Sequence, residues 1–149
     1  MISISVNQLQ FRIREGSKGD EIFDPFRKKW FVITPEEWVR QTLLAHLVQQ
    51  LDYPSALVSV ERGIRVGELK RRFDAVVFGK NGSPWMLIEC KAPGESITDA
   101  AVGQLLAYQS VLGAGFLLLS NGQHIRCWQV INAIVTELDA LPLFDKTQL

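Results

Sequence analysis

The sequence has few of the residues that build disulfide frameworks or histidine-based metal centres. It contains only two cysteines, Cys90 and Cys127, and two histidines, His46 and His124. Two widely separated cysteines exclude a disulfide scaffold and a four-ligand zinc site, and two histidines argue against a histidine-built metal centre.

The sequence also lacks net charge and long apolar runs. Sixteen basic residues balance sixteen acidic ones, so no overall field steers the protein toward nucleic acid, and any such surface must be local. No apolar stretch approaches the roughly 18 residues that would span a bilayer. The first residues show no basic segment followed by an apolar run. We therefore expect a soluble, cytoplasmic protein with no membrane contact and with both thiols reduced.

What remains is the composition of one globular domain. Of the 149 residues, 47% are apolar and 21% are charged. Folding at this length should bury about 70% of the surface of the unfolded chain. Since the chain shows no repeat and no linker, we expect one domain over residues 1–149, with an N-terminal extension over 1–33 and a C-terminal tail over 131–149.

Two helices are expected. Thr34 is suited to cap the first helix, Pro35 suits its first turn, and its apolar stripe continues until Pro54 ends it. The second helix is expected over 97–112, ended by Gly113.

Strands are expected before, between and after these helices. A short strand is expected over 9–13, and the tail should hold a strand end and one helical turn. The other strands are expected over 56–60, with an extension to 66, and over 69–78, 85–91, 116–120 and 125–130. This order predicts an α/β fold in which a mixed central sheet is flanked by helices.

The most informative segment is the turn at Asn81-Gly82, a pair typical of tight β-hairpins. A two- or four-residue loop centred there places Asp74 directly opposite Glu89, with both side chains on one face of the sheet. Lys91 lies on the same face because side chains alternate along a strand. A three-residue loop would shift the register by one residue and remove this arrangement.

Two close carboxylates on apolar strands require a shared proton, separating water or a cation. A hard divalent ion such as Mg²⁺, held by both acids, a backbone carbonyl and waters, meets that requirement. Such an ion polarises a phosphate oxygen, and Lys91 could orient or deprotonate the attacking water. The arrangement thus suits metal-assisted hydrolysis of phosphodiesters. The alternative is an ordinary solvated face on which Asp74 and Glu89 pair with Arg72 and Lys91.

These residues resemble a known superfamily. Phe73-Asp74, then Glu89-Cys90-Lys91, then Gln104-x-x-x-Tyr108 on the second helix resemble the PD-(D/E)XK nucleases. More closely, the chain is similar to the N-terminal nuclease domain of type I restriction enzyme R subunits. The motifs that carry this similarity extend over roughly residues 22–130. Besides those motifs, the similarity includes residues 22–25, 34–41, 89–93 and 121–122. The sequence departs from the motif at Phe73, where a proline is expected.

The resemblance implies a restriction-endonuclease-like core and a role for each residue of the motif. Asp74, Glu89 and the Cys90 carbonyl would ligate Mg²⁺ or Mn²⁺, and Lys91 would serve the attacking water. The change to Phe73 should have little effect on metal binding.

Three further residues have two interpretations each. Glu37 would complete the acidic cluster, directly or through water, but it also stands where a capping box with Thr34 requires an acid. Gln104 and Tyr108 share a helix face. The resemblance gives them contacts with DNA or with Lys91, whereas the sequence alone favours an ordinary half-buried polar edge.

The basic residues also have two interpretations. Arg40 and Arg72 could contact phosphate, or pair internally with Glu37 and Asp74. A charge run is usually a solvated face, but a cluster of this kind can also bind a nucleic-acid backbone. The expected nucleic-acid contacts are Arg40, Arg62, Arg65, Lys70, Arg71 and Arg72.

The sequence as a whole predicts a Mg²⁺-dependent DNA nuclease of the restriction type. The alternatives are a catalytically silent DNA- or protein-binding module of nuclease-like fold, or an assembly role in a complex. No Walker-type phosphate loop is present in the sequence, so we do not expect a complete ATP-driven restriction subunit. Besides DNA, the expected partners are a motor or restriction-complex subunit, or a second copy of the chain that helps grip both strands.

Overall fold

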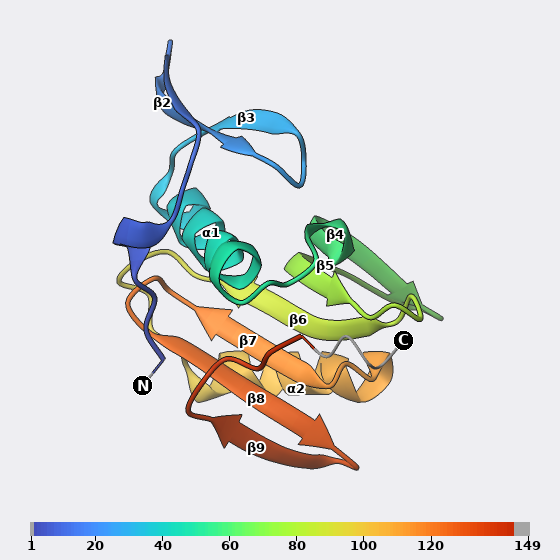
Figure 1. Ribbon diagram of the computed structural model, residues 1–149. Coiled ribbons are helices and arrows are strands. Elements are labelled where there is room, and N and C mark those ends of the chain that lie inside the picture. Colours follow the sequence, from blue (N-terminus) through green and yellow to red (C-terminus); the bar gives the residue numbers. More distant parts are fainter. Residues whose placement is uncertain (1, 145–149) are drawn as a thin grey trace.

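The computed structural model describes residues 2–144 and is built around a six-stranded mixed sheet with helices on its two faces (Figure 1). The strands lie in the order β4-β5-β6-β7-β8-β9. Only β6 and β7 pair in parallel among them, because helix α2 connects these two strands. The predicted α/β class is confirmed. The strands are β4 (Val58–Val66), β5 (Leu69–Phe78), β6 (Pro84–Cys90), β7 (Phe116–Ser120), β8 (Ile125–Ile131) and β9 (Ile134–Leu138).

Helices α1 (Pro35–Ala45) and α2 (Asp99–Leu112) cover opposite faces of this sheet (Figure 1). On one face, Leu43 of α1 packs in a core cluster with Ile88 of β6. On the other face, Leu105 of α2 packs in a second cluster with Leu87 of β6. Neither helix, within residues 2–144, has the length and apolar character needed to cross a membrane.

The predicted starts and ends of the helices are largely confirmed. The Thr34 hydroxyl accepts the Glu37 N–H at 3.1 Å, and Pro35 is the first residue of α1. Beyond Ala45, the helical path continues as a π-helical turn over His46–Gln50. Helix α2 begins two residues later than expected and ends at Gly113 in the left-handed conformation.

The expectation for the N-terminal segment is wrong. In place of a strand over 9–13, the chain forms a separate three-stranded antiparallel sheet of β1 (Ile13–Gly16), β2 (Gly19–Asp24) and β3 (Lys29–Val32). This sheet lies beside α1, away from the central sheet (Figure 1). Its strands mix charged and apolar residues without a clear period, and only their inward-facing positions, such as Ile22, are buried.

The expected helical turn in the tail is also wrong for its described part, residues 131–144. Asn132 and Ala133 both have positive φ, at 50° and 65°, and make a tight turn between β8 and β9. Two consecutive left-handed residues are the geometry of a two-residue hairpin, normally signalled by Asn-Gly. The sequence Asn-Ala hides that signal.

The predicted register of the Asn81-Gly82 hairpin is confirmed. Ala75 pairs with Ile88, and the next two pairs follow in the same register. The expected two- or four-residue loop is wrong, because Phe78 pairs with Pro84 and residues 79–83 form the connection, in which the Gly79 N–H donates to the Ser83 carbonyl at 2.8 Å. A register shift between Val77 and Phe78 compensates for this loop and keeps the predicted register along the rest of the hairpin. The next step along the strands away from the loop brings Asp74 level with Glu89.

Candidate active site

Asp74 lies at the point where β5 and β6 stop pairing. The last paired residues on the two strands are Ala75 and Ile88. At the next position, Asp74 Oδ2 accepts the backbone N–H of Cys90 at 2.7 Å, so a side chain replaces the backbone ladder. This bond fixes the Asp74 carboxylate against the end of β6.

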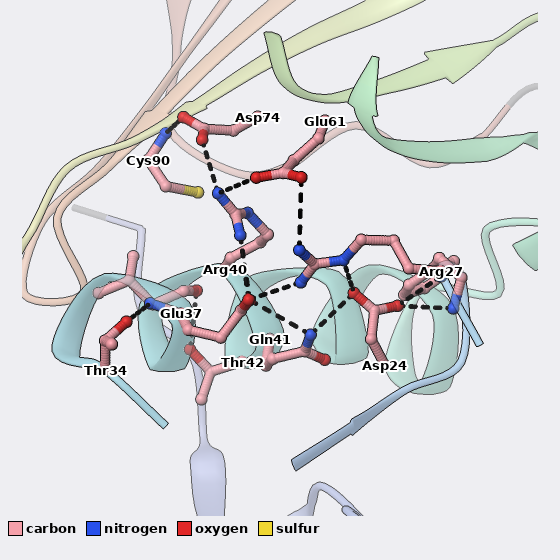
Figure 2. A network of polar contacts seen from close by, with 12 residues as sticks. Asp24, Arg27, Thr34, Glu37, Arg40, Gln41, Thr42, Glu61, Asp74 and Cys90 are labelled. Carbon is pink, nitrogen blue, oxygen red and sulfur yellow. Dashed lines mark hydrogen bonds and ion pairs between the residues drawn. The ribbon is translucent and has the colours of Figure 1, made fainter. Parts of the chain in front are cut away.

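The second oxygen of Asp74 is held by Arg40 from α1. Arg40 Nη2 donates to Asp74 Oδ1 at 2.9 Å, and Arg40 Nη1 donates to both oxygens of Glu37 at 3.1 and 3.2 Å (Figure 2). Burial lowers the pKa of Arg40, but the hydrogen bond to Asp74 and the charge of Glu37 outweigh it and raise this pKa above its ordinary value. Of its two predicted roles, Arg40 therefore takes the internal one in this structure.

A second arginine extends the network to the N-terminal sheet. Arg27 pairs with Asp24 at 2.6 Å, with Glu37 at 2.6 Å and with Glu61 at 3.6 Å (Figure 2). Asp24 Oδ1 also accepts the N–H groups of Phe26 and Arg27, so it closes the turn after β2. Sequence reasoning missed Arg27, although Asp24 is only three residues away, because its contacts with Glu37 and Glu61 join separate elements of the fold.

Glu37 therefore does not close a capping box. Its carboxylate lies between Arg27 and Arg40, while the Thr34 N–H donates to the Val32 carbonyl instead. The Arg40 guanidinium lies between Glu37 and Asp74 (Figure 2). A direct acidic cluster of these two residues is not formed.

Glu89 is the less satisfied of the two acids. Its side chain is 14% exposed, and the nearest cation is Arg71, with Nη2 at 3.4 Å from Glu89 Oε1. That oxygen is buried and has no hydrogen-bond partner. Burial and then the charge of Asp74 raise the pKa of Glu89 to about 7, although Arg71 lowers it in part. The charge of Asp74 thus acts on Glu89.

Arg71 is held against the site by two aromatic rings. Its guanidinium lies 4.3 Å from the centre of the Tyr108 ring and 4.8 Å from that of Phe73. The rings are perpendicular, with centres 5.9 Å apart. The structure therefore brings Tyr108 of α2 against Arg71, the cation that pairs with Glu89. Gln104 is exposed and, among the described residues, makes no hydrogen bond to either acid.

Lys91 follows directly after β6. Its backbone N–H donates to the Ser120 carbonyl at 2.7 Å, and the residue is half-buried. Within residues 2–144, neither Lys91 nor Arg72 forms an ion pair with an acid. The alternative in which these two residues neutralise Glu89 and Asp74 is therefore not found. Arg71 and Arg40 occupy those places.

The donor set suits a hard divalent cation. In the described part of the chain, no three His, Cys, Asp or Glu side chains cluster as metal ligands, so side chains alone do not complete a site. Two carboxylates with a backbone carbonyl and waters are a set that Mg²⁺ accepts. A carboxylate oxygen has two lone pairs, so Asp74 can accept more than its present bonds, and Glu89 Oε1 has no bond to give up.

The other basic residues of the predicted patch lie on the β4–β5 hairpin. Arg65 pairs with Lys70 across this hairpin, next to the turn at Gly67. All of them are exposed. They are Arg62, Arg65, Lys70 and Arg72.

Comparison with known proteins places the chain in a family. No curated protein sequence matches the chain. Among solved structures, one similar chain is a DUF820 candidate nuclease from Anabaena variabilis ATCC 29413. It is 16% identical with a TM-score of 0.48, and the alignment covers 85% of this chain and 79% of that one. The family described as Type I restriction enzyme R protein N terminus (HSDR_N) matches residues 35–142, a range that contains both acids and Lys91. The chain belongs to this family of type I restriction enzyme R protein N-terminal domains.

Proposed function

We propose that this chain is a metal-dependent deoxyribonuclease that hydrolyses phosphodiester bonds with Mg²⁺ or Mn²⁺. The observation that carries the proposal is the position of Asp74 and Glu89 where β5 and β6 separate, with Glu89 Oε1 buried and without a hydrogen-bond partner. A buried acid pair that lacks a full set of partners is suited to a divalent cation. Membership of the restriction family supports a nuclease over other uses of such a pair.

The reaction adds water to phosphorus as one P–O ester bond breaks, and it yields a phosphomonoester and an alcohol. Asp74, Glu89 and the Cys90 carbonyl would hold the metal ion, which supplies Lewis acidity toward a phosphate oxygen. Lys91 would orient the attacking water, which passes one proton to solvent. The leaving oxygen takes up a proton from solvent, so protons balance.

DNA is the proposed substrate, and the exposed basic β4–β5 hairpin is the proposed backbone contact. Its charges lie on one projecting hairpin of a chain with no net charge. Local basic patches of this kind bind phosphates in a salt-dependent manner. A motor subunit of a restriction complex, or a second copy of the chain, would complete the grip on duplex DNA in the cytoplasm.

A cleavage assay tests the proposal. Plasmid and single-stranded DNA are incubated with Mg²⁺ or Mn²⁺ and wild type, Asp74→Asn or Lys91→Ala. Both variants should lose activity by about 10²-fold or more, since each removes a part of the transition-state stabilisation. Arg126→Ala, on β8 outside the site, is the matched control and should cleave like wild type. Cleavage that survives equally in both site variants would come from a contaminant and would contradict the proposal.

A catalytically silent DNA- or protein-binding module is the second candidate. It is favoured by the bonds that already occupy both oxygens of Asp74, from Arg40 and from Cys90. In that case no metal supports cleavage, but the chain binds DNA with strong salt dependence. Cleavage that appears only when a partner subunit is added would instead support the nuclease and contradict the silent binding module.

A further inference from the structure

Arg71 differs from the other basic residues of its hairpin. Arg62, Arg65 and Lys70 are exposed, whereas Arg71 is half-buried between the rings of Phe73 and Tyr108. A guanidinium stacked on aromatic faces is weakly hydrated and already ordered, so it loses little entropy when it binds an anion. Arg71 is thus preorganised, and its position beside Glu89 puts it within the candidate site.

The hydrogen-bonding capacity of Arg71 is not used. Its Nη2 lies 3.4 Å from Glu89 Oε1, which is beyond a good hydrogen bond. Arg71 Nη1 and Glu89 Oε1 are both buried without a hydrogen-bond partner. Buried polar atoms without partners are costly, so a donor and an acceptor left open side by side indicate a missing ligand.

The ligand must satisfy both groups. Arg71 offers a planar fork of N–H donors, which matches two oxygens of a phosphate. Glu89 offers a negative oxygen, which a phosphate cannot approach directly but can reach through a cation. A phosphodiester whose non-bridging oxygens contact Arg71 on one side and a divalent ion on the other meets both conditions.

We propose that Arg71 binds the phosphate at which the chain acts and stabilises the negative charge that develops there during hydrolysis. Phe73 and Tyr108 act as positioning residues that hold its guanidinium. This inference rests on the proposed nuclease function. It gives Arg71 a role in the site itself, distinct from that of the exposed basic residues.

The inference also explains a departure from the family motif. Phe73 stands where a proline is expected, and its side chain is fully buried against Tyr108 and Arg71. A proline at this position has no π face with which to hold the guanidinium. The aromatic residue at 73 and the arginine at 71 therefore form one structural unit with Tyr108.

The test compares Arg71→Ala and Arg71→Lys with wild type, and Arg126→Ala is the matched control. Arg126 also stacks on a ring, that of Trp128 at 4.9 Å, and also pairs with a glutamate, Glu137, but it lies on β8. Three quantities are measured. They are kcat and KM for cleavage in Mg²⁺, the affinity for a labelled single-stranded oligonucleotide in Ca²⁺ (with its integrity verified) over a range of salt, and Mn²⁺ binding by calorimetry.

Arg71→Ala should lower kcat by about 10²- to 10³-fold, as removal of one charge-stabilising donor does. Its oligonucleotide affinity should fall, and the slope of log affinity against log salt should shrink by about 0.7, the value for one phosphate contact on a single strand. Arg71→Lys keeps the positive charge but not the planar fork of donors, so its kcat and oligonucleotide affinity should lie between those of wild type and Arg71→Ala. Mn²⁺ binding should not weaken in either variant, because Arg71→Ala removes a positive charge near the metal ligands and Arg71→Lys keeps it. Arg126→Ala should match wild type in all three measurements.

Several results would overturn the inference. One is an Arg71→Ala variant that cleaves and binds oligonucleotide like wild type. Another is an Arg71→Ala variant that loses Mn²⁺ binding together with oligonucleotide binding, which indicates a structural role. A wild type that neither cleaves nor binds oligonucleotide also overturns it. If the wild type binds but never cleaves, and Arg71→Ala selectively reduces the affinity and the salt slope, the phosphate contact stands and only the proposed hydrolysis fails.

Discussion

Arg40 is the residue whose loss should cost the most stability outside the apolar core. It is 9% exposed and is hydrogen-bonded to both Glu37 and Asp74. Arg40→Ala leaves Asp74 without its ion-pair partner and Glu37 without one of its two, which should lower the free energy of unfolding by about 3–5 kcal/mol. Urea denaturation measures this change.

The matched comparison is Arg126→Ala. Arg126 is 35% exposed and pairs with Glu137, which is 48% exposed. Exposed pairs contribute about 0–1 kcal/mol, so this variant should unfold close to wild type. Equal loss in the two variants would show that the Arg40 network is not buried as the structure has it.

The two thiols should be unreactive in the folded protein. Burial raises the pKa of Cys127 to about 12 and that of Cys90 well above its ordinary value. The thiolate is the nucleophile, so at pH 8 both groups stay protonated in the native state but become reactive when unfolding restores a pKa of about 8.5. Ellman's reagent should therefore label both thiols in denaturant and neither of them quickly in buffer. Rapid labelling of one thiol in buffer would contradict their burial.

At the residue scale, the sequence was informative where chemistry and register coincide. The pairing of Asp74 with the position opposite it followed from the turn at Asn81-Gly82, and the structure confirms that register up to Ala75. The partners of the acids were less predictable. For Arg40, internal pairing was one of two interpretations that the sequence left open. Arg71 was expected on an exposed patch, because neither stacking on aromatic rings nor long-range ion pairing leaves a local sequence signal.

At the element scale, the β7–β8 turn should be sensitive to one methyl group. Gly122 has φ of 87°, and a Cβ there would lie 2.9 Å from Val39 Cγ2 on α1. Gly82 has a similar φ of 82° in the β5–β6 turn, but a Cβ there would meet nothing within 4 Å. Comparison of alanine variants at these two positions therefore distinguishes the cost of backbone strain from the cost of a steric conflict.

Both alanine variants should therefore lose stability, but by different amounts. Gly82→Ala should cost about 1–2 kcal/mol because of its left-handed conformation. Gly122→Ala should cost about 1–3 kcal/mol more, because Val39 must move within a packed core. Chemical denaturation of the two variants measures the difference. Equal losses would show that the turn does not pack against α1.

The elements themselves were predictable where local signals are strong. Thr34 and Pro35 set the start of α1, and Gly113 sets the end of α2, as expected. Strands β1, β3 and β9 were missed because they are short and have no buried residue, and β2 because only Ile22 and Asp24 in it are buried. Their pairing depends on partners that pattern alone does not reveal.

At the scale of the whole molecule, the candidate site joins three parts of the fold. Arg27 and Arg40 connect the N-terminal sheet and α1 to Asp74 on β5 (Figure 2). Arg71 connects β5 to Tyr108 on α2. A ligand that binds the native site and not the unfolded chain raises stability by mass action. Binding of a ligand at this site should therefore raise the stability of the whole folded chain.

Divalent metal should stabilise the wild type against thermal unfolding. At a free metal concentration of about 100 times Kd, the gain is about 2.7 kcal/mol. Glu89→Gln should lose this gain, whereas Glu61→Gln, a matched change in an exposed acid of the neighbouring network, should retain it. The unfolding midpoint with Mg²⁺ and with a chelator measures both. A gain that persists in Glu89→Gln would show that metal binds elsewhere.

The central claim is that Asp74 and Glu89 together hold one divalent cation. The most direct measurement is a crystal structure of the chain with Mn²⁺, in which anomalous scattering locates the ion. We predict one strong peak in contact with both carboxylates and near the Cys90 carbonyl. Absence of any peak there, or a peak at Glu61 and Glu37 instead, would contradict the claim.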